Sequence, residues 1–239
     1  MMRGMVLAIE TSQRNASVAL GALSLEVKGG ACMSEPVDTS DRNIEDVLPA
    51  IERLFTRSQV KREHIGALAI NQGPGGFTGL RIAHAAAQVI AQAWSIPVVQ
   101  ISAAVVAREA AVLSKSISAD QTVWVALAAK GDGCWMARVS NPHQGNDLPE
   151  HVGVLDEDHW PLGAAEALIA DEHLPASWRE KARVSAVSII DLRPSAEAVL
   201  HVARRQLARG HHVAPEHILP VYPREAEAVR LWRERQGPN

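Results

Sequence analysis

Two short polar segments of this 239-residue chain carry residue types that can bind an anion. In the first, an acid and two hydroxyls follow the apolar run Met5–Ile9: Glu10, Thr11 and Ser12. In the second, small residues gather just before a long alanine-rich stretch: Gly73, Gly75, Gly76 and Thr78. Backbone N–H groups of a glycine loop, helped by hydroxyls, are typical ligands of a phosphate group.

Two interpretations of the glycine loop remain open. A loop that opens onto a helix offers free N–H groups and the positive end of the helix dipole to an anion. Alternatively, the glycines only allow a tight packing turn. The loop is not a Walker loop, because Phe77 and Thr78 follow Gly76 and no lysine is placed to reach a terminal phosphate. It is not the dinucleotide fingerprint either.

The elements around the glycine loop predict a βαβ unit. Ile65–Ile70 has the length and apolarity of a buried strand. Gly79–Trp94 has helical periodicity, with Thr78 as its expected N-cap, and Pro97 ends it before the strand Val98–Ile101. Two such strands joined by a helix are parallel and neighbouring.

The N-terminal segment predicts a β-meander of three strands, Met5–Ser12, Ala16–Leu20 and Leu23–Val27. A meander followed by helix, strand, helix and strand is the order of the actin/Hsp70/sugar-kinase (ASKHA) architecture, an α/β fold of duplicated ribonuclease H-like lobes. In that architecture the acid after the first strand belongs to a phosphate loop. Here Glu10 is followed by neither the usual glycine nor a nearby lysine, so the loop is expected to be vestigial.

The second half of the chain predicts a second, degenerate lobe. Its expected elements, in order, are helix 103–113, strands 122–128 and 135–139, helix 161–170, strand 184–190 and a helix from Pro194 to Arg209. We expect the domain boundary near residue 102, with an N-terminal lobe at 1–102 and a C-terminal lobe at 103–239.

Two helical stripes of apolar residues offer a surface for a partner or for a second copy of the chain. They are Ile44, Val47, Leu48 and Ile51 on one helix, and Ile82, Ala83, Ala86, Ala87 and Ile90 on the next. The alternative is that the stripes only cover the chain's own sheet.

Composition excludes several function classes. With 24 basic and 27 acidic residues, the chain has no general attraction to RNA. Its sequence contains neither a signal peptide nor a stretch long enough to span a bilayer, and its two cysteines fit a reducing, cytoplasmic location. His211, His212 and His217 lack acidic or cysteine partners at ligand spacing, so we expect no metal site.

Several of these segments together resemble the TsaB (YeaZ) family. The matching segments are Leu7–Ser12, Ser17–Leu20, Val47–Ile51, Gly73–Arg81, Ile96–Val98 and Pro220–Arg224. The resemblance is dense over about the first hundred residues, and the glycine-loop motif is its most specific part.

The resemblance implies a scaffold without catalytic residues or a cofactor of its own. Such proteins form homodimers and, together with TsaE, hold the related catalytic subunit TsaD, which makes N6-threonylcarbamoyladenosine in tRNA. It also implies that the two helices serve both the homodimer and TsaD, and that tRNA is reached only through the complex. Asn43 replaces a histidine frequent in the family, and Ala128-Ala129-Lys130 replaces Asp-Ala-Arg.

Two other functions remain as alternatives. A sugar-kinase-like phosphotransferase or ATPase would use Glu10 and the glycine loop. A peptidase is the weakest, because the chain lacks the two histidines, four residues apart, of the catalytic relative.

Overall fold

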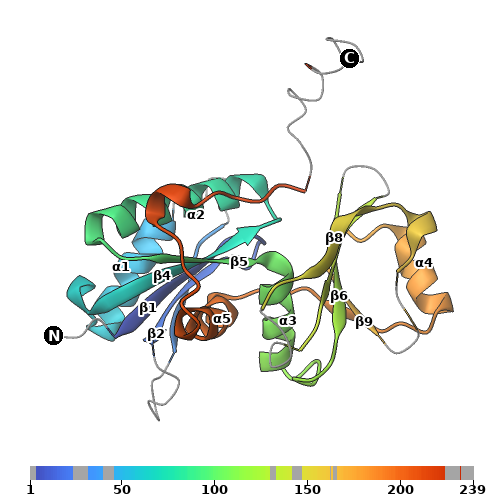
Figure 1. The fold of residues 1–239 in the computed structure, drawn as a ribbon, viewed down its shortest axis with the longest axis horizontal. Coiled ribbons are helices and arrows are strands. Elements are labelled where there is room, and N and C mark those ends of the chain that lie inside the picture. The colour runs from blue at the N-terminus through green and yellow to red at the C-terminus, as the bar shows by residue number, and fades with distance from the viewer. Residues whose placement is uncertain are drawn as a thin grey trace.

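The computed structural model contains two five-stranded sheets, each flanked by helices (Figure 1). It describes residues 4–23, 32–39, 46–129, 133–141, 147–161, 163, 166–223 and 232. The first sheet has the order β3-β2-β1-β4-β5 and the second the order β8-β7-β6-β9-β10. In both sheets the first three strands form an antiparallel meander, and the last two are parallel to the central strand.

The first lobe follows the predicted order of elements. Its elements are β1 (Met5–Glu10), β2 (Ser17–Ala22), β3 (Met33–Pro36), α1 (Val47–Ser58), β4 (Ile65–Gly73), α2 (Phe77–Trp94) and β5 (Val98–Ser102). The third strand of the described meander is β3. The expected strand Leu23–Val27 lies outside the described residues except for Leu23, which is in a bend. The N-cap of α2 is Gly76 and not the expected Thr78, which lies inside the helix.

The second sheet repeats the first with fewer helices. Its elements are α3 (Ala103–Leu113), β6 (Val123–Ala128), β7 (Cys134–Val139), β8 (Glu150–Leu155), β9 (Ala167–Ala170), α4 (Ala176–Val184), β10 (Ile189–Asp191) and α5 (Ala196–Ala208). Short 3-10 turns lie at Arg62–His64, Glu157–His159 and Pro215–His217. The expected helix 161–170 is wrong, because its last residues form β9. The expected strand 184–190 begins in the last residue of α4, and β10 covers only its end.

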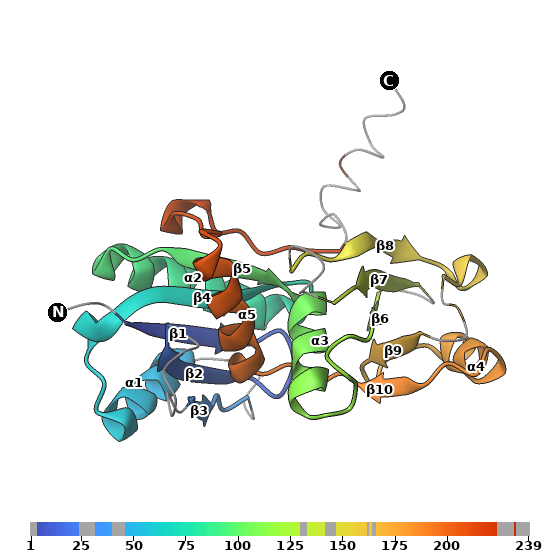
Figure 2. The same cartoon turned by 60° about the horizontal axis from the view of Figure 1, so that its bottom comes forward.

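Alternation along the strands decides which helix covers which face of the first sheet. The larger side chains of β1, Leu7 and Ile9, share one apolar cluster with α1 and α2. The smaller ones, Val6 and Ala8, face the other way and share a cluster with α5. Small residues allow a helix to approach closely, so α5 lies directly on this face (Figure 2).

Two helices, α3 and α5, join the lobes. Helix α3 follows β5 directly and packs against both sheets, on β4 and β5 of the first and on β6 and β7 of the second. Helix α5 follows the second sheet but packs on β1, β2, β4 and β5 of the first. The other face of the second sheet is covered by α4, whose Trp178 is fully buried. The duplicated strand order and the crossing helices confirm the predicted actin-like α/β fold with a reduced second lobe.

The division of the chain at residue 102 stays a prediction. The first sheet ends at Ser102, but α5 and the segment around Val213, which forms a bridge with Val98, return to it. Among the described residues, every helix is too short or too polar to cross a membrane.

Candidate functional site

A buried polar network closes the ends of β1 and β4. The Glu10 carboxylate accepts hydrogen bonds at Oε1 from the Ser12 N–H (2.7 Å) and the Ser12 hydroxyl (2.6 Å). Its Oε2 accepts one from the Asn71 side-chain amide at 2.7 Å. All three residues are at most 2% exposed. Burial raises the pKa of Glu10 above its ordinary value, although these hydrogen bonds act to lower it.

The glycine loop packs against the segment that follows β1. The Gly76 N–H donates to the Ser12 carbonyl at 2.8 Å, and the Thr11 hydroxyl donates to the Gly79 carbonyl at 2.9 Å. A Cβ on Gly75 would lie 2.6 Å from both the Cβ and the carbonyl oxygen of Ser12. Close packing therefore explains the glycine at this position, which favours the packing interpretation of the loop.

The C-terminal motif lies beside the glycine loop. The Val221 N–H donates to the Gln72 carbonyl at 2.6 Å. Gly73 has φ of +98°, and a Cβ there would lie 2.6 Å from the Val221 carbonyl oxygen. Phe77 and Tyr222 place their ring centroids 5.1 Å apart. The glycine loop and the C-terminal segment of the family resemblance, far apart in the sequence, therefore form one structural unit.

A cleft of about 570 Å³ separates this unit from the second sheet. Thr11, Ser12, Gly75, Gly76 and Thr78 line one side, and Leu127, Ala128, Asp171 and His173 line the other. The structure thus brings the predicted phosphate-loop residues to one place, except Glu10 and Gly73, which lie beneath its surface.

The cleft does not expose the acid that a phosphotransferase of this fold would use. Both carboxylate oxygens of Glu10 are occupied by Ser12 and Asn71. Across the cleft, at the end of β6, stands Ala128, whose methyl group can neither bind a cation nor take a proton. Asp171 is half-buried, and burial raises its pKa.

The described residues contain no group of three histidine, cysteine, aspartate or glutamate side chains that could hold a metal ion. His84 is buried on α2, where its Nδ1 lies 2.7 Å from the Leu80 carbonyl oxygen. Burial lowers the pKa of His84 and so favours the neutral ring. Asn43 and Lys130, two of the departures from the family pattern, lie outside the described residues.

Helices α1 and α2 lie together over one face of the first sheet, joined by an edge-on contact between Phe55 and Trp94 with centroids 5.9 Å apart. Most of the predicted interface residues point into the core between these helices and the sheet. The buried ones are Val47, Ile51, Ala83, Ala87 and Ile90. Leu48 is exposed, Ile82 and Ala86 are half-buried, and Ile44 lies outside the described residues.

The outward side of these helices is also apolar in places. Leu48 on α1 is 56% exposed, and Val89 on α2 is 66% exposed. Near the start of α2, Phe77 is exposed beneath the Arg81 guanidinium, which lies 4.5 Å from the ring centroid. The aromatic and cationic pair was not predicted from the sequence, although both residues belong to the glycine-loop motif.

Comparison with known proteins agrees with these features. A family model described as "TsaD: tRNA N6-adenosine threonylcarbamoyltransferase" matches residues 28–134. TsaB of Escherichia coli K12, a tRNA threonylcarbamoyladenosine biosynthesis protein, is 25% identical over 97% of this chain and 98% of its own length. A tRNA N6-adenosine threonylcarbamoyltransferase of Staphylococcus epidermidis is 29% identical over 41% of this chain and 32% of its own.

Among solved structures, YeaZ of Pseudomonas aeruginosa superposes with a TM-score of 0.70 and 26% identity, covering 92% of this chain and 99% of YeaZ. The likeness to TsaB and YeaZ spans both lobes, whereas the likeness to the transferase is confined to part of the chain. The fold, the motifs and these relatives support the assignment of this chain to the TsaB (YeaZ) family.

Proposed function

We propose that this chain acts in the biosynthesis of threonylcarbamoyladenosine in tRNA, as a scaffold subunit without catalysis or a cofactor of its own. The likeness to the TsaB family supports the role in this biosynthesis. The observation that carries the scaffold role is the closed network at Glu10, whose carboxylate is occupied by Ser12 and Asn71. A carboxylate that is buried and accepts three hydrogen bonds from its neighbours is not exposed to a substrate in the cleft.

The proposed partners are TsaD, TsaE and a second copy of the chain, all in the cytoplasm, with tRNA bound only through the complex. We place the contact with TsaD and with the second copy on the outward side of α1 and α2, within the lobe 1–102. Leu48 and Val89 are exposed there, while Ile82 and Ala86 are accessible at its edge. The residues buried beneath them support this surface from below and do not contact the partner.

A charge on this surface tests the proposal. Leu48→Asp and Val89→Asp should weaken association with TsaD at least about tenfold, because an unpaired carboxylate in a desolvated helix contact is costly. The same variants should abolish any homodimer. Association is measured by light scattering after size exclusion, for the chain alone and mixed with its cognate TsaD.

Val184→Asp provides the matched control. Val184 ends α4 in the second lobe, is 71% exposed and lies away from α1 and α2. It should associate like the wild type. If the Leu48 and Val89 variants keep their fold and associate as well as this control, the partner surface has been placed on the wrong helices.

The phosphotransferase alternative has its own test. The cleft is large enough for a nucleotide, so calorimetry with ATP and magnesium addresses it directly. We expect no heat of binding up to millimolar nucleotide. Heat that disappears in Glu10→Gln would instead assign a nucleotide site to the strand ends.

A further inference from the structure

The contact between the two lobes is made largely by α3 and α5, which lie side by side. Helix α3 packs on the second sheet as well as on β4 and β5, whereas α5 packs on the first sheet. A change in the angle between the lobes must therefore move α3 relative to α5. The contacts between α3 and α5 therefore control the width of the cleft between the glycine loop and the second sheet.

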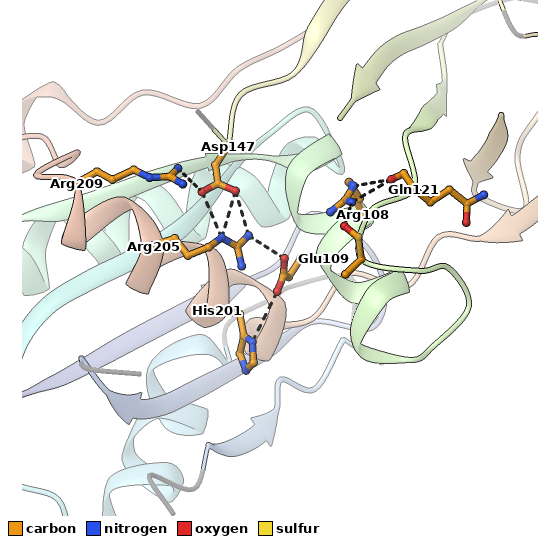
Figure 3. A network of polar contacts seen from close by, with 8 residues as sticks. Arg108, Glu109, Gln121, Asp147, His201, Arg205 and Arg209 are labelled. Atoms are coloured by element: carbon orange, nitrogen blue, oxygen red, sulfur yellow. Dashed lines mark hydrogen bonds and ion pairs between the residues drawn. The ribbon is translucent and has the colours of Figure 1, made fainter. Parts of the chain in front are cut away.

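A network of ion pairs joins them at one point (Figure 3). Arg205 on α5 reaches Glu109 on α3 at 2.8 Å and Asp147, in the loop before β8, at 3.1 Å. Arg209, just beyond α5, reaches the second oxygen of Asp147 at 2.9 Å. His201 on α5 lies 3.6 Å from the other oxygen of Glu109. The network thus connects α3, α5 and a loop of the second lobe.

The two carboxylates of the network are buried. The side chain of Asp147 is 0% exposed and that of Glu109 is 8% exposed. Burial alone would raise the pKa of Glu109, but contacts with His201 and Arg205 lower it to about 2, so it is ionised at neutral pH. Two carboxylates and the guanidinium groups of Arg205 and Arg209 balance in charge.

A second set of hydrogen bonds holds α3 to the segment that follows it. Arg108 donates to the Gln121 carbonyl at 3.1 Å and to the Ala119 carbonyl at 2.6 Å, in the connection from α3 to β6 (Figure 3). Helix α3 is therefore tied to the second lobe through Arg108, and α5 is tied to α3 through Arg205. Separating the charges would leave Asp147 and Glu109 buried and unpaired, which strongly opposes movement.

We propose that the network of Glu109, Asp147, Arg205 and Arg209 is a lock that holds the two lobes at one angle. The cleft then keeps a fixed width, and the chain meets its partners as one rigid body instead of closing on a ligand. This inference concerns the motion of the isolated chain and does not depend on the identity of the partners.

The distance between two spin labels tests the lock. Labels are attached through Glu63→Cys in the first lobe and Glu180→Cys on α4, both exposed, in a chain whose Cys32 and Cys134 are replaced by alanine. The chain with an intact network should give one narrow distance distribution. In Asp147→Asn, which keeps the shape but removes the charge, the narrow distribution should be lost and a broader one should replace it.

Asp191→Asn is the matched control. It removes the carboxylate of a pair with Arg193 whose side chains are 78% and 79% exposed, and the distribution should stay narrow. A broad or double-peaked distribution in the chain with an intact network would overturn the proposal. So would a folded Asp147→Asn with an unchanged width.

If Asp147→Asn does not fold, Arg209→Gln replaces it. This variant leaves Arg205 bound to both carboxylates, and Arg209 is 35% exposed, so its loss disturbs the core less. A smaller broadening is expected, and an unchanged width would overturn the proposal in the same way. Circular dichroism confirms that each variant is folded.

Discussion

The two lobes share one strand order but differ at the ends of their central strands. In the first lobe, Glu10 and Asn71 meet in a buried network that the glycine loop covers. In the second, the equivalent strands β6 and β9 end at Ala128 and are followed by Asp171, with no hydrogen bond between the two side chains, since alanine has no polar atom. The first lobe thus has a buried polar junction at its strand ends, whereas the second has a polar side chain on only one of the two strand ends.

The lobes also differ in how many helices cover them. Helices α1 and α2 cover one face of the first sheet, whereas α4 alone among the described helices covers the corresponding face of the second. Between β8 and β9 the described residues form only the 3-10 turn Glu157–His159. The first lobe therefore presents a two-helix layer on this face, whereas the described part of the second presents one helix.

The largest expected effect comes from removing the acid at each strand end. Glu10→Ala should lower the free energy of unfolding by about 3–4 kcal/mol, because the Ser12 N–H, the Ser12 hydroxyl and the Asn71 amide lose their buried acceptor. Asp171→Ala, its counterpart, should change it by less than about 1 kcal/mol, since Asp171 is only half-buried and accepts an exposed hydrogen bond from the His173 N–H. Urea unfolding measures both. Equal losses would mean that the two strand ends are equally structural.

The pH dependence of the free energy of unfolding tests the ion-pair network between the lobes. Glu109 has a pKa of about 2 in the folded protein against an ordinary value of 4.5. The folded state therefore binds this proton more weakly than the unfolded state. The stability contributed by the ionised carboxylate, about 3 kcal/mol, is complete above about pH 5 and is lost as the pH falls towards 2.

Glu109→Gln should accordingly be less stable at neutral pH and should lose less of its remaining stability on acidification. Thermal unfolding followed between pH 7 and 3 measures the two slopes. Parallel slopes for the variant and the wild type would show that Glu109 does not couple the lobes through its charge.

A smaller difference in stability is expected between glycine substitutions in the two lobes. Gly75→Ala should cost about 2 kcal/mol, because the new methyl group would overlap the Cβ and the carbonyl oxygen of Ser12. Gly153→Ala in β8 meets nothing within 4 Å and should stay within about 0.5 kcal/mol of the wild type. Chemical denaturation compares them. A neutral Gly75→Ala would contradict the packing interpretation of the glycine loop.

The sequence predicted the first lobe well because its elements are long and strongly patterned. Apolar runs of strand length predicted β1, β4 and β5, and helical periodicity predicted α2. The N-cap of α2 was misplaced because Gly76 is fixed by its hydrogen bond to Ser12, a contact between distant segments. Local propensity at Thr78 carries no information about such a contact.

The second lobe was predicted less well because β9 and β10 are short and β8 is exposed at the sheet edge. Residues Ala167–Ala170 continue an alanine-rich stretch that has helical propensity, and only pairing with β6 and β10 makes them a strand. Strand β8 was missed because Val152 and Val154 face solvent at the sheet edge, next to charged residues. Tertiary pairing overrode propensity in both cases.

The sequence predicted which residues come together at the candidate site, but it did not predict what they do there. The residues around Glu10 and the glycine loop do meet, as the fold required. That Asn71 would occupy the Glu10 carboxylate could not be read from either segment alone. The lock was not predicted, because Glu109 and Arg205 are far apart in the sequence and isolated charges ordinarily indicate a solvated surface.

The return of α5 to the first sheet also sets the order in which the molecule can be completed during synthesis. The first sheet is made early, but α5, which covers one of its faces, begins only at Ala196. At about 5–20 residues per second, the ribosome needs roughly 5–20 s to make the chain between Ser102 and that helix. Until then Val6, Ala8 and their neighbours lack their cover, and the nascent N-terminal half exposes a hydrophobic surface that a chaperone can recognise.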